Sequence, residues 1–378
     1  MNSKKSSSIV IGLALFAMFF GSGNLIYPLF VGISSSNTIA SSSLGFLMTA
    51  VLLPFLGVIA MVLFKGDYQS FFRILGKKLG FIFSMLLLTI WIPLGSAPRC
   101  IALAYSSISA YIDIGPIWMF SAIYSIFVFY VIRTKMGFLD ILGKIITPLL
   151  IGSILIIFIL GLKTGVSPHL ATKDFAFFRS LKEGYNTMDL IASFFFSASI
   201  IQILYKKTKS MPSSIKMIVK SSVIGMSLLA FVYLMLIFIA AKYSDVLMGV
   251  QKDQLLAFLA KVILGSKFSV ISLIAIVLAC FSTSVALVIS YSDFLQLQVF
   301  KNKKDINISI VFSIAISFVM SLFGLNGITF ITAPVLKFCY PILLSLIFIN
   351  IVKIMIQEKR EMGEKNKIKQ KQKANVLD

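Results

Sequence analysis

The sequence predicts an all-α integral membrane protein with about ten transmembrane helices, and two observations carry this prediction: the composition and the pattern of apolar runs. The chain has 378 residues, is 58% hydrophobic and has only 13% charged residues, about half the charged fraction usual in soluble domains. Its mean hydropathy is +0.97. Apolar runs of about twenty residues, each able to cross a hydrocarbon core of about 30 Å, recur along nearly the whole chain. Because the runs are continuously apolar rather than alternating, they predict helices and not barrel strands.

Ten runs are long enough to be spans. The first follows Lys4 and Lys5, as the core of a signal peptide would, but it is longer than a typical signal core and lacks a small-x-small cleavage pattern, so we count it as a span. The segment KDQLLAFLAKVILGSK at 252–267 is amphipathic and too charged to cross. The expected spans are 9–31, 38–64, 79–108, 116–132, 139–162, 185–204, 217–241, 268–296, 306–323 and 328–352.

The basic residues orient these spans, because Lys and Arg accumulate in cytoplasmic loops. With the N-terminus inside, 25 of the 35 Lys and Arg fall on the cytoplasmic side, 8 on the other side and 2 within spans. Both termini are therefore expected in the cytoplasm. The formal charge of +21 is then explained by topology and by anionic membrane lipids, without nucleic acid. The expected organisation is a leader (1–8), a first repeat (9–162), an extracytoplasmic loop (163–184), a second repeat (185–352) and a basic cytoplasmic tail (353–378).

Two spans contain sequence that breaks a helix. The stretch FFGSGNLIYP at 19–28 places four poor helix formers together at 21–24, with Pro28 a turn later. The stretch GYNTMDLIAS at 184–193 crowds polar residues at the start of the sixth span. An unpartnered backbone group costs several kcal/mol in hydrocarbon, so a break survives only where it lines a cavity or binds something. The breaks are five spans apart. Because five is odd, a second set of five spans enters the bilayer from the opposite side, which predicts an inverted five-plus-five repeat. Irregular segments at matching positions of two such repeats predict a transporter-type binding site at the breaks.

A broken helix offers free N–H groups on one side of the gap and free C=O groups on the other. The N–H end suits a carboxylate, and the carbonyl end suits an ammonium group or Na⁺. Ser282 and Thr283, in ACFSTSVAL of the eighth span, add two hydroxyls near mid-membrane. These hydroxyls either bond back to their own helix or bind a hard cation together with first-span carbonyls. The sequence leaves both interpretations open.

Arg99 and Asp189 are the intramembrane charges that need an explanation, because each costs on the order of 3 kcal/mol at mid-bilayer. Arg99 follows Pro98 and serves either a structural or gating ion pair or the substrate carboxylate. Asp189 either faces an ammonium group or cation or is a solvated residue near the outer mouth. Beyond the sixth-span break, one face with Phe194, Ile191 and Phe195 could form an apolar pocket or ordinary packing. His169 stands alone and the three cysteines are far apart in sequence, so no metal site or disulfide is expected.

Five motifs together resemble the BrnQ-type branched-chain amino acid:cation symporters, the LIVCS family. The motifs are ALFAMFFGSGNLIYPLFVG (14–32), PLGSAPRCIAL (93–103), GYNTMDLIAS (184–193), ACFSTSVAL (279–287) and APVLKFCYP (333–341). They occur in family order and cover roughly residues 9–350. The resemblance implies Na⁺-coupled uptake of leucine, isoleucine and valine across the bacterial inner membrane, with a LeuT-like fold and no cofactor beyond Na⁺ as the coupling ion.

By this resemblance, the carbonyls of Ala17 and Phe20 with the hydroxyls of Ser282 and Thr283 would bind Na⁺. The expected partners are the branched-chain amino acid, Na⁺ and membrane lipids. A symporter of another small solute, a membrane-embedded enzyme and a channel are the alternatives, and H⁺ coupling through Asp189 stays open. The substrate-binding candidates are Gly21, Ser22, Gly23, Asn24, Arg99, Tyr185, Asn186, Thr187, Asp189 and Phe194.

Overall fold

The computed structural model describes residues 8–35, 38–133, 141–163, 176–301 and 305–374, and every regular element in these ranges is a helix. The predicted leader up to Ser7 and His169 lie outside them. The elements are α1 (Ser8–Phe19), α2 (Ser22–Ile33), α3 (Ile39–Leu47), η1 (Met48–Leu52), α4 (Leu53–Leu63), α5 (Tyr68–Phe72), η2 (Arg73–Leu75), α6 (Lys77–Trp91), η3 (Ile92–Ser96), α7 (Ala97–Ser109), α8 (Ile117–Arg133), η4 (Leu142–Ile146), α10 (Thr147–Lys163), α11 (Ala176–Tyr185), α12 (Asp189–Thr208), α13 (Met211–Lys242), α14 (Ser244–Leu247), α15 (Leu255–Phe268), α16 (Val270–Phe294), η5 (Leu295–Val299), α17 (Ile306–Ser321) and α18 (Gly324–Ala374).

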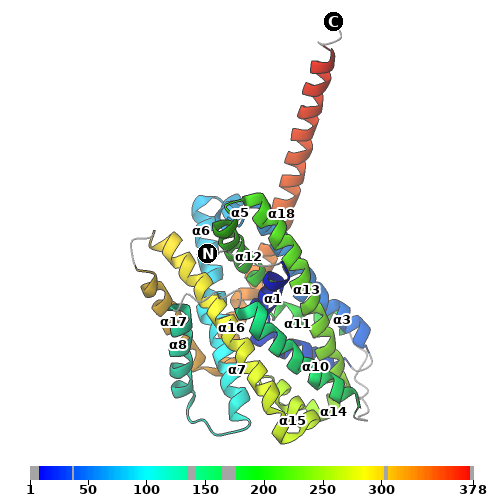
Figure 1. Ribbon diagram of the computed structural model, residues 1–378, viewed down its shortest axis with the longest axis vertical. Coiled ribbons are helices and arrows are strands. Elements are labelled where there is room, and N and C mark those ends of the chain that lie inside the picture. The colour runs from blue at the N-terminus through cyan, green and yellow to red at the C-terminus, as the bar shows by residue number, and fades with distance from the viewer. Residues whose placement is uncertain (1–7, 36–37, 134–140, 164–175, 302–304, 375–378) are drawn as a thin grey trace.

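The helices form one bundle, from which the C-terminal part of α18 projects (Figure 1). Within the described ranges, seven helical segments are long and apolar enough to cross a membrane, and the bent pair α1 and α2 makes an eighth span. Two further apolar helices, α8 and α17, are shorter, with 17 and 16 residues. The predicted number of ten is reached only when these two are included. The amphipathic segment predicted not to cross forms α15, which is kinked at Gly265.

The first predicted break is present and sharp. Helix α1 ends at Phe19 and α2 begins at Ser22, and their axes meet at 73°. Gly21 between them has an extended backbone. Its Cα faces the eighth span so closely that a Cβ there would lie 2.8 Å from the Cγ2 of Thr283. The Gly-Ser-Gly sequence therefore does two things, since it ends the first helix and lets α16 approach the break.

The second break lies within the sixth span and not at its start. Helix α11 contains residues 176–184, which we assigned to the extracytoplasmic loop, together with Tyr185, and α12 begins at Asp189. The sixth span therefore starts earlier than predicted, because α11 is packed on α3, where the Thr49 hydroxyl donates to the Leu181 carbonyl at 2.9 Å. Between α11 and α12, Met188 adopts the left-handed backbone conformation. This residue changes the direction of the chain.

The packing of the spans is symmetric about the two breaks. Helices α1 and α2 of the first span pack on α13 of the seventh, and α12 of the sixth packs on α4 of the second. The third span packs on the eighth through α7 and α16, and the fourth on the ninth through α8 and α17. When the first five spans are exchanged with the last five, the pair of spans one and seven becomes the pair of spans six and two. The pair three and eight and the pair four and nine stay the same. This is the contact pattern that a five-plus-five inverted repeat predicts.

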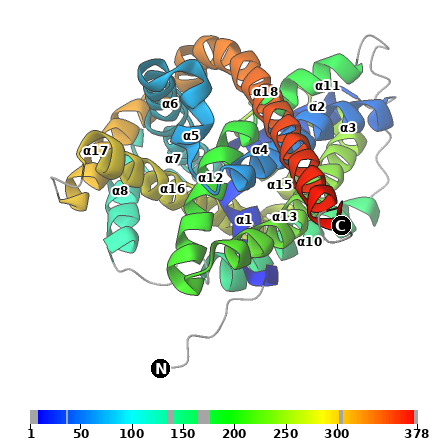
Figure 2. The same ribbon diagram turned by 90° about the horizontal axis from the view of Figure 1, so that it is seen from above.

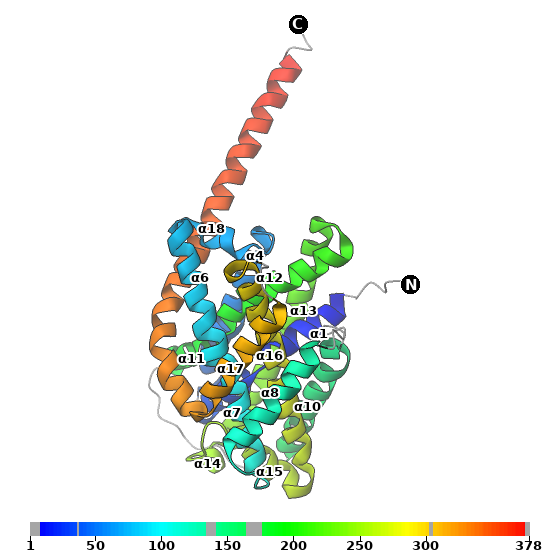
Figure 3. The ribbon, with the colours of Figure 1, turned by 90° about the vertical axis from the view of Figure 1, so that its left-hand side faces the viewer.

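The broken spans lie inside the bundle. Seen from above, α1 and α12 lie between the other helices (Figure 2), and a side view shows α6 and α18 along one flank (Figure 3). Next to the breaks, the third span changes from α-helix to the π-helix η3 at Ile92–Ser96, a segment that contains Pro93. A π-helical turn inside an α-helix is frequent at functional sites. Here it directly precedes the turn that carries Arg99.

Candidate functional site

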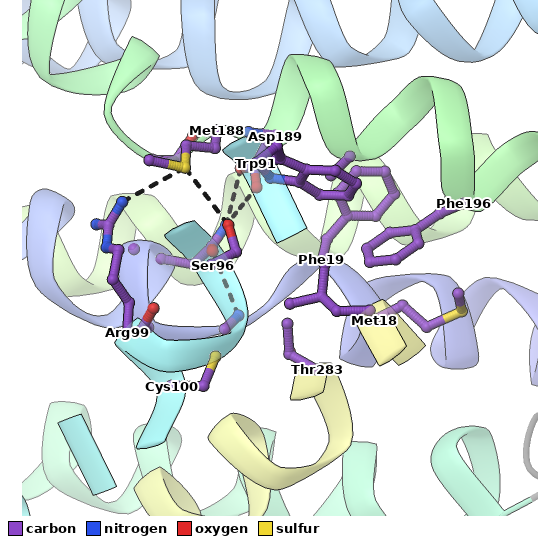
Figure 4. Close-up of a pocket in the computed structure, with 17 residues that line it drawn as sticks. Met18, Phe19, Trp91, Ser96, Arg99, Cys100, Met188, Asp189, Phe196 and Thr283 are labelled. Atoms are coloured by element: carbon purple, nitrogen blue, oxygen red, sulfur yellow. Dashed lines mark hydrogen bonds between the residues drawn. The ribbon is translucent and has the colours of Figure 1, made fainter. Parts of the chain in front are cut away.

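A small cavity lies where the two breaks meet (Figure 4). The cavity has a volume of about 20 Å³, which is room for about one water molecule. Gly23 and Thr187 bring the breaks together, since a Cβ on Gly23 would lie 3.1 Å from both the Cα and the carbonyl oxygen of Thr187. The predicted site residues that line the cavity are Gly21, Ser22, Gly23, Asn24, Arg99, Thr187, Asp189 and Thr283.

A buried hydrogen-bond network joins Asp189 to the first span. The Asn24 amide nitrogen lies 2.9 and 2.8 Å from the two carboxylate oxygens, and the Tyr233 hydroxyl donates to one of them at 2.7 Å. The Asn24 amide also contacts the Tyr233 hydroxyl, and its oxygen accepts from the Gly21 N–H at 3.3 Å. Asp189 is 2% exposed, and these side-chain partners are neutral, so its negative charge needs a compensating proton or cation.

Arg99 is the cationic counterpart of Asp189 in the cavity wall. It is 2% exposed, donates to the Tyr27 hydroxyl at 2.9 Å and lies over the Tyr27 ring. Its other guanidinium contacts are the Asn186 carbonyl and the Met188 sulfur, both at 3.5 Å. The Nε atom is buried, and it has no hydrogen-bond partner among the residues that the structure describes. A buried guanidinium with neutral partners and a spare donor favours an anionic ligand.

The opposite side of the cavity is apolar. Figure 4 shows Arg99 on one side and Met18, Phe19 and Phe196 on the other, and Trp91 packs against Phe196 with ring centroids 5.6 Å apart. The α12 residues Asp189 and Phe196 are seven positions apart and therefore share a helix face. One cavity thus has a charged side and an apolar side.

Phe194 does not line this cavity, which corrects its assignment to the substrate pocket. It follows Asp189 by five residues, and at 3.6 residues per turn it is rotated about 140° away. Its ring packs on Phe71 and Phe72, with centroids 4.8 and 6.4 Å apart. Phe196, one turn from Ala192 on the same helix face as Asp189, occupies the position that we assigned to Phe194.

Tyr185 and Asn186 also lie outside the lining of the cavity. The Tyr185 carbonyl accepts from the Tyr340 hydroxyl at 2.8 Å, and the two rings pack edge to face. The Asn186 side chain donates to Glu183 at 2.9 Å, and its carbonyl faces Arg99. These two residues thus shape the end of α11, while Thr187 and Asp189 are the residues of this break that reach the cavity.

Three of the four predicted cation ligands, Ala17, Ser282 and Thr283, lie close together next to the cavity. The hydroxyls of Ser282 and Thr283 lie 3.4 and 3.3 Å from the Ala17 carbonyl oxygen. Ser282 also bonds back to the Ala279 carbonyl at 2.9 Å, so both interpretations of this hydroxyl are compatible with the geometry. Phe20 is buried at the break, and its ring stacks on Phe16 with centroids 5.0 Å apart. The Ala17 carbonyl oxygen thus lies beside the Ser282 and Thr283 hydroxyls. The role of the Phe20 carbonyl stays a prediction.

Several lining residues were missed from the sequence. The π-helical turn places Ser96 within 3.4 Å of the Met188 sulfur, and Trp91 directly precedes that turn. The Pro and Gly of IPLGS, inside a long apolar span, were a usable signal for this irregularity. Tyr233, which does not line the cavity but donates to Asp189, was also missed, although it stands alone among apolar residues in its turn of the seventh span. The cavity-lining residues absent from the candidates are Met18, Phe19, Trp91, Ser96, Cys100, Met188, Ala192, Phe196 and Leu287.

A small cavity with charged and apolar sides, held by two interrupted helices inside a membrane bundle, defines a transporter of the LeuT-like class. Solved structures share this fold. The nucleobase-cation-symport-1 family transporter Mhp1, in a closed conformation with bromovinylhydantoin bound, matches 91% of this chain and 77% of its own, with a TM-score of 0.59 and 17% identity. MhsT in complex with L-phenylalanine matches 87% of this chain and 81% of its own, with a TM-score of 0.55 and 14% identity. These likenesses confirm the predicted fold class.

The family described as branched-chain amino acid transport protein matches residues 4–368, and the chain belongs to this family. The branched-chain amino acid permease BrnQ of Corynebacterium glutamicum is 30% identical over 367 residues, which cover 93% of this chain and 82% of the permease. The BrnQ permease of Bacillus subtilis is 29% identical, with 96% and 85% covered. The predicted family is therefore confirmed, and the protein is a multi-pass membrane transporter rather than an enzyme.

Proposed function

We propose that the protein imports leucine, isoleucine and valine by Na⁺-coupled alternating access. Its expected location is the bacterial inner membrane, with both termini in the cytoplasm. Family membership supports the class of substrate, and the basic residues of the loops support the orientation. The symmetric packing of spans one and two against seven and six supports the mechanism, because such repeats move against each other around a central site.

The observation that carries the proposal is the pair of opposite buried charges at the cavity. An amino acid is a zwitterion, and its ammonium group would compensate Asp189 while its carboxylate binds the spare donor of Arg99. Both side chains are 2% exposed with neutral side-chain partners, so each gains from an opposite charge. The free N–H groups at the start of α2, next to Gly21, add a second partner for the carboxylate.

The apolar side of the cavity supports an aliphatic side chain. Met18, Phe19 and Phe196 form this side, and they provide no strong polar partner for a substrate. The cavity has room for about one water molecule, which is less than the four carbons of the leucine side chain occupy. Binding therefore requires these residues to move apart. Such a movement links substrate binding to a conformational change, as alternating access needs.

Na⁺ as the coupling ion is supported by the oxygen atoms at Ala17, Ser282 and Thr283, because hard cations prefer oxygen ligands. These atoms join the end of α1 to α16, so a bound cation would stabilise the broken helix against the eighth span. Asp189 supports a second candidate. Its buried carboxylate, with neutral side-chain partners, could carry a proton instead, which would make the transporter H⁺-coupled.

Uptake of labelled leucine into proteoliposomes tests the proposal. We expect accumulation that depends on an inward Na⁺ gradient and is competed by isoleucine and valine but not by phenylalanine or glutamate. Dissipating the proton gradient with an ionophore in the presence of Na⁺ distinguishes Na⁺ coupling from H⁺ coupling. Accumulation that persists without either gradient would exclude coupled transport, and competition by nucleobases but not by aliphatic amino acids would exclude the substrate class.

A further inference from the structure

A second polar pocket lies away from the transport site, where three spans end together. Helix α4 ends at Leu63, α6 begins at Lys77 and η5 ends at Val299, and a hydrogen bond between the side chains of Gln69 and Gln298 joins the α5 segment to η5. The pocket between these elements has a volume of about 490 Å³. Since it lies at span ends, it faces the level of the lipid headgroups.

Four cationic side chains line this pocket, which we call the basic pocket: Arg73, Lys77, Lys78 and Lys301. All four are exposed, and no carboxylate is among the lining residues. Asp67, on the same connection, accepts hydrogen bonds from the N–H groups of Gln69 and Ser70 and from the Ser70 hydroxyl, so it caps α5. The basic pocket therefore concentrates positive charge that no lining residue neutralises.

The two lysines stand where a helix normally prefers acids. Lys77 and Lys78 are in the first turn of α6, and the N-cap residue Gly76 supplies no side-chain cap. The positive end of the helix dipole repels cations and attracts anions, and the first N–H groups of a helix are hydrogen-bond donors without an intrahelical partner. An anion bound there would relieve the repulsion and accept from these donors. The four cationic side chains and the N-terminal end of α6 thus both favour a negatively charged ligand.

We propose that the basic pocket binds the phosphate of an anionic phospholipid. A phosphate group suits this set because Arg and Lys side chains bind its oxygens with charge-assisted hydrogen bonds. A lipid rather than a free phosphate is favoured by the neighbouring surface of α6, where Leu79 and Ile82 are 65% and 57% exposed. Acyl chains can lie along this apolar surface while the headgroup enters the pocket, as in other basic pockets between transmembrane helices.

The test measures retention of fluorescent phosphatidylglycerol by the full-length protein in mixed micelles with phosphatidylcholine. The test variant carries R73Q, K77Q, K78Q and K301Q. The control variant removes the same charge elsewhere with K65Q, K209Q, K216Q and K220Q. Each cation near an anionic surface contributes roughly five-fold to affinity before screening. We therefore expect the test variant to lose at least about ten-fold in affinity for phosphatidylglycerol and the control variant to lose much less.

Three results would overturn the proposal. The first is equal retention by wild type and test variant, and the second is an equal loss in both variants, which would indicate net charge alone. The third is displacement of phosphatidylglycerol from the wild type by millimolar inorganic phosphate, which would assign the pocket to a soluble anion. The monodispersity and thermal unfolding of both variants are measured first, and because all substituted side chains are exposed, we expect both to fold. Transport is not needed for the readout, so the result is independent of the proposed function.

Discussion

Asn24 and Asp189 are 165 residues apart in the sequence, and their side chains connect the two helix breaks. The Asn24 amide nitrogen lies 2.9 and 2.8 Å from the carboxylate oxygens of Asp189. Asn24 is in the first turn of α2, and Asp189 begins α12. Any ligand that compensates the carboxylate therefore acts at the contact between the first and sixth spans. In the proposed mechanism, this contact links substrate binding directly to the two helices that alternating access would move.

The first prediction concerns the charge of Asp189. We expect Asp189→Asn to reduce leucine uptake at least about 100-fold, because loss of a partner for a buried charge costs about 3 to 5 kcal/mol. The amide can keep a hydrogen bond to Tyr233, so the protein should stay folded. Asp113→Asn, in an exposed loop, is the control and should leave uptake unchanged. Uptake in proteoliposomes at wild-type level in Asp189→Asn would exclude both the ammonium role and the proton role of this residue.

The second prediction concerns Arg99 and the substrate carboxylate. Arg99→Gln should raise the KM for leucine about 10- to 100-fold, since a hydrogen bond to a charged group contributes about 1.5 to 3 kcal/mol. Arg99→Lys should also fail to restore it, because lysine cannot reproduce the planar set of donors. The exposed Arg133→Gln is the control. Leucinol, which lacks the carboxylate, provides the decisive comparison. If Arg99→Gln weakens leucinol competition as much as leucine competition, Arg99 acts through structure and not through the carboxylate.

Apolar run length allowed the sequence to predict the helical membrane class. The break at Gly21 was also predictable, because its cause is local: glycine and asparagine are poor helix formers. The break before Asp189 was predicted less accurately. Helix α11 is held by tertiary packing on α3, including the bond from Thr49, and no local propensity records this.

Several residues of the candidate site could be predicted from their residue type. Which side chains point into the cavity was harder to predict. Arg99 and Asp189 stood out because charges within a membrane are costly, and Asn24 stood out because it belongs to a stretch of poor helix formers. Phe194 was misassigned because, at 3.6 residues per turn, it points about 140° away from Asp189, whereas Phe196 shares the helix face of Asp189 and lines the cavity. Trp91 reaches the cavity next to the π-helical turn, whose extra residue changes the register of the third span. Such a shift in helix register depends on the local backbone geometry, so the amino-acid composition of the span does not predict it.

The third prediction concerns the proposed Na⁺ ligands. In the double variant S282A/T283A, the half-saturating Na⁺ concentration for leucine uptake should rise about ten-fold or more, because two hydroxyl oxygens are lost next to the Ala17 carbonyl. Ser290→Ala is a matched control: this buried serine is on the same helix and bonds back to the Ala286 carbonyl at 2.9 Å. It should leave the Na⁺ dependence unchanged. An unaltered half-saturation in the double variant would remove these hydroxyls from the cation site.

The fourth prediction concerns the contact of the two breaks. Gly23→Ala adds a methyl group 3.1 Å from the Thr187 Cα and carbonyl oxygen, and backbone atoms cannot move aside as a side chain can. We expect the maximal rate of uptake to fall about five-fold or more, because overpacking of this kind costs about 1 to 3 kcal/mol. Gly152→Ala, in the transmembrane helix α10, meets no atom within 4 Å and should transport normally. Equal rates for both variants would mean that the breaks do not stay in contact during transport.

The fifth prediction concerns the size of the aliphatic side chain that the cavity accepts. Ala192 lies on the face of α12 that carries Asp189 and Phe196, and it lines the cavity. Ala192→Val adds two methyl groups to a space with room for about one water molecule. We therefore expect the KM for leucine to rise more than the KM for valine or alanine. One methylene in an apolar pocket contributes about 1 to 3 kcal/mol, so the preference for leucine over valine should fall about ten-fold or more.

Ala198→Val separates this effect from general crowding. Ala198 is also buried on α12, but it lies nine residues after Asp189 and therefore on the opposite helix face. The added methyl groups there should lower the thermal stability of the protein without changing the ratio of leucine to valine uptake. Competition of labelled leucine by unlabelled leucine, valine and alanine gives the ratio for each variant. If both variants shift the ratio equally, the side chain of the substrate does not contact the Ala192 face, and the apolar side of the site lies elsewhere.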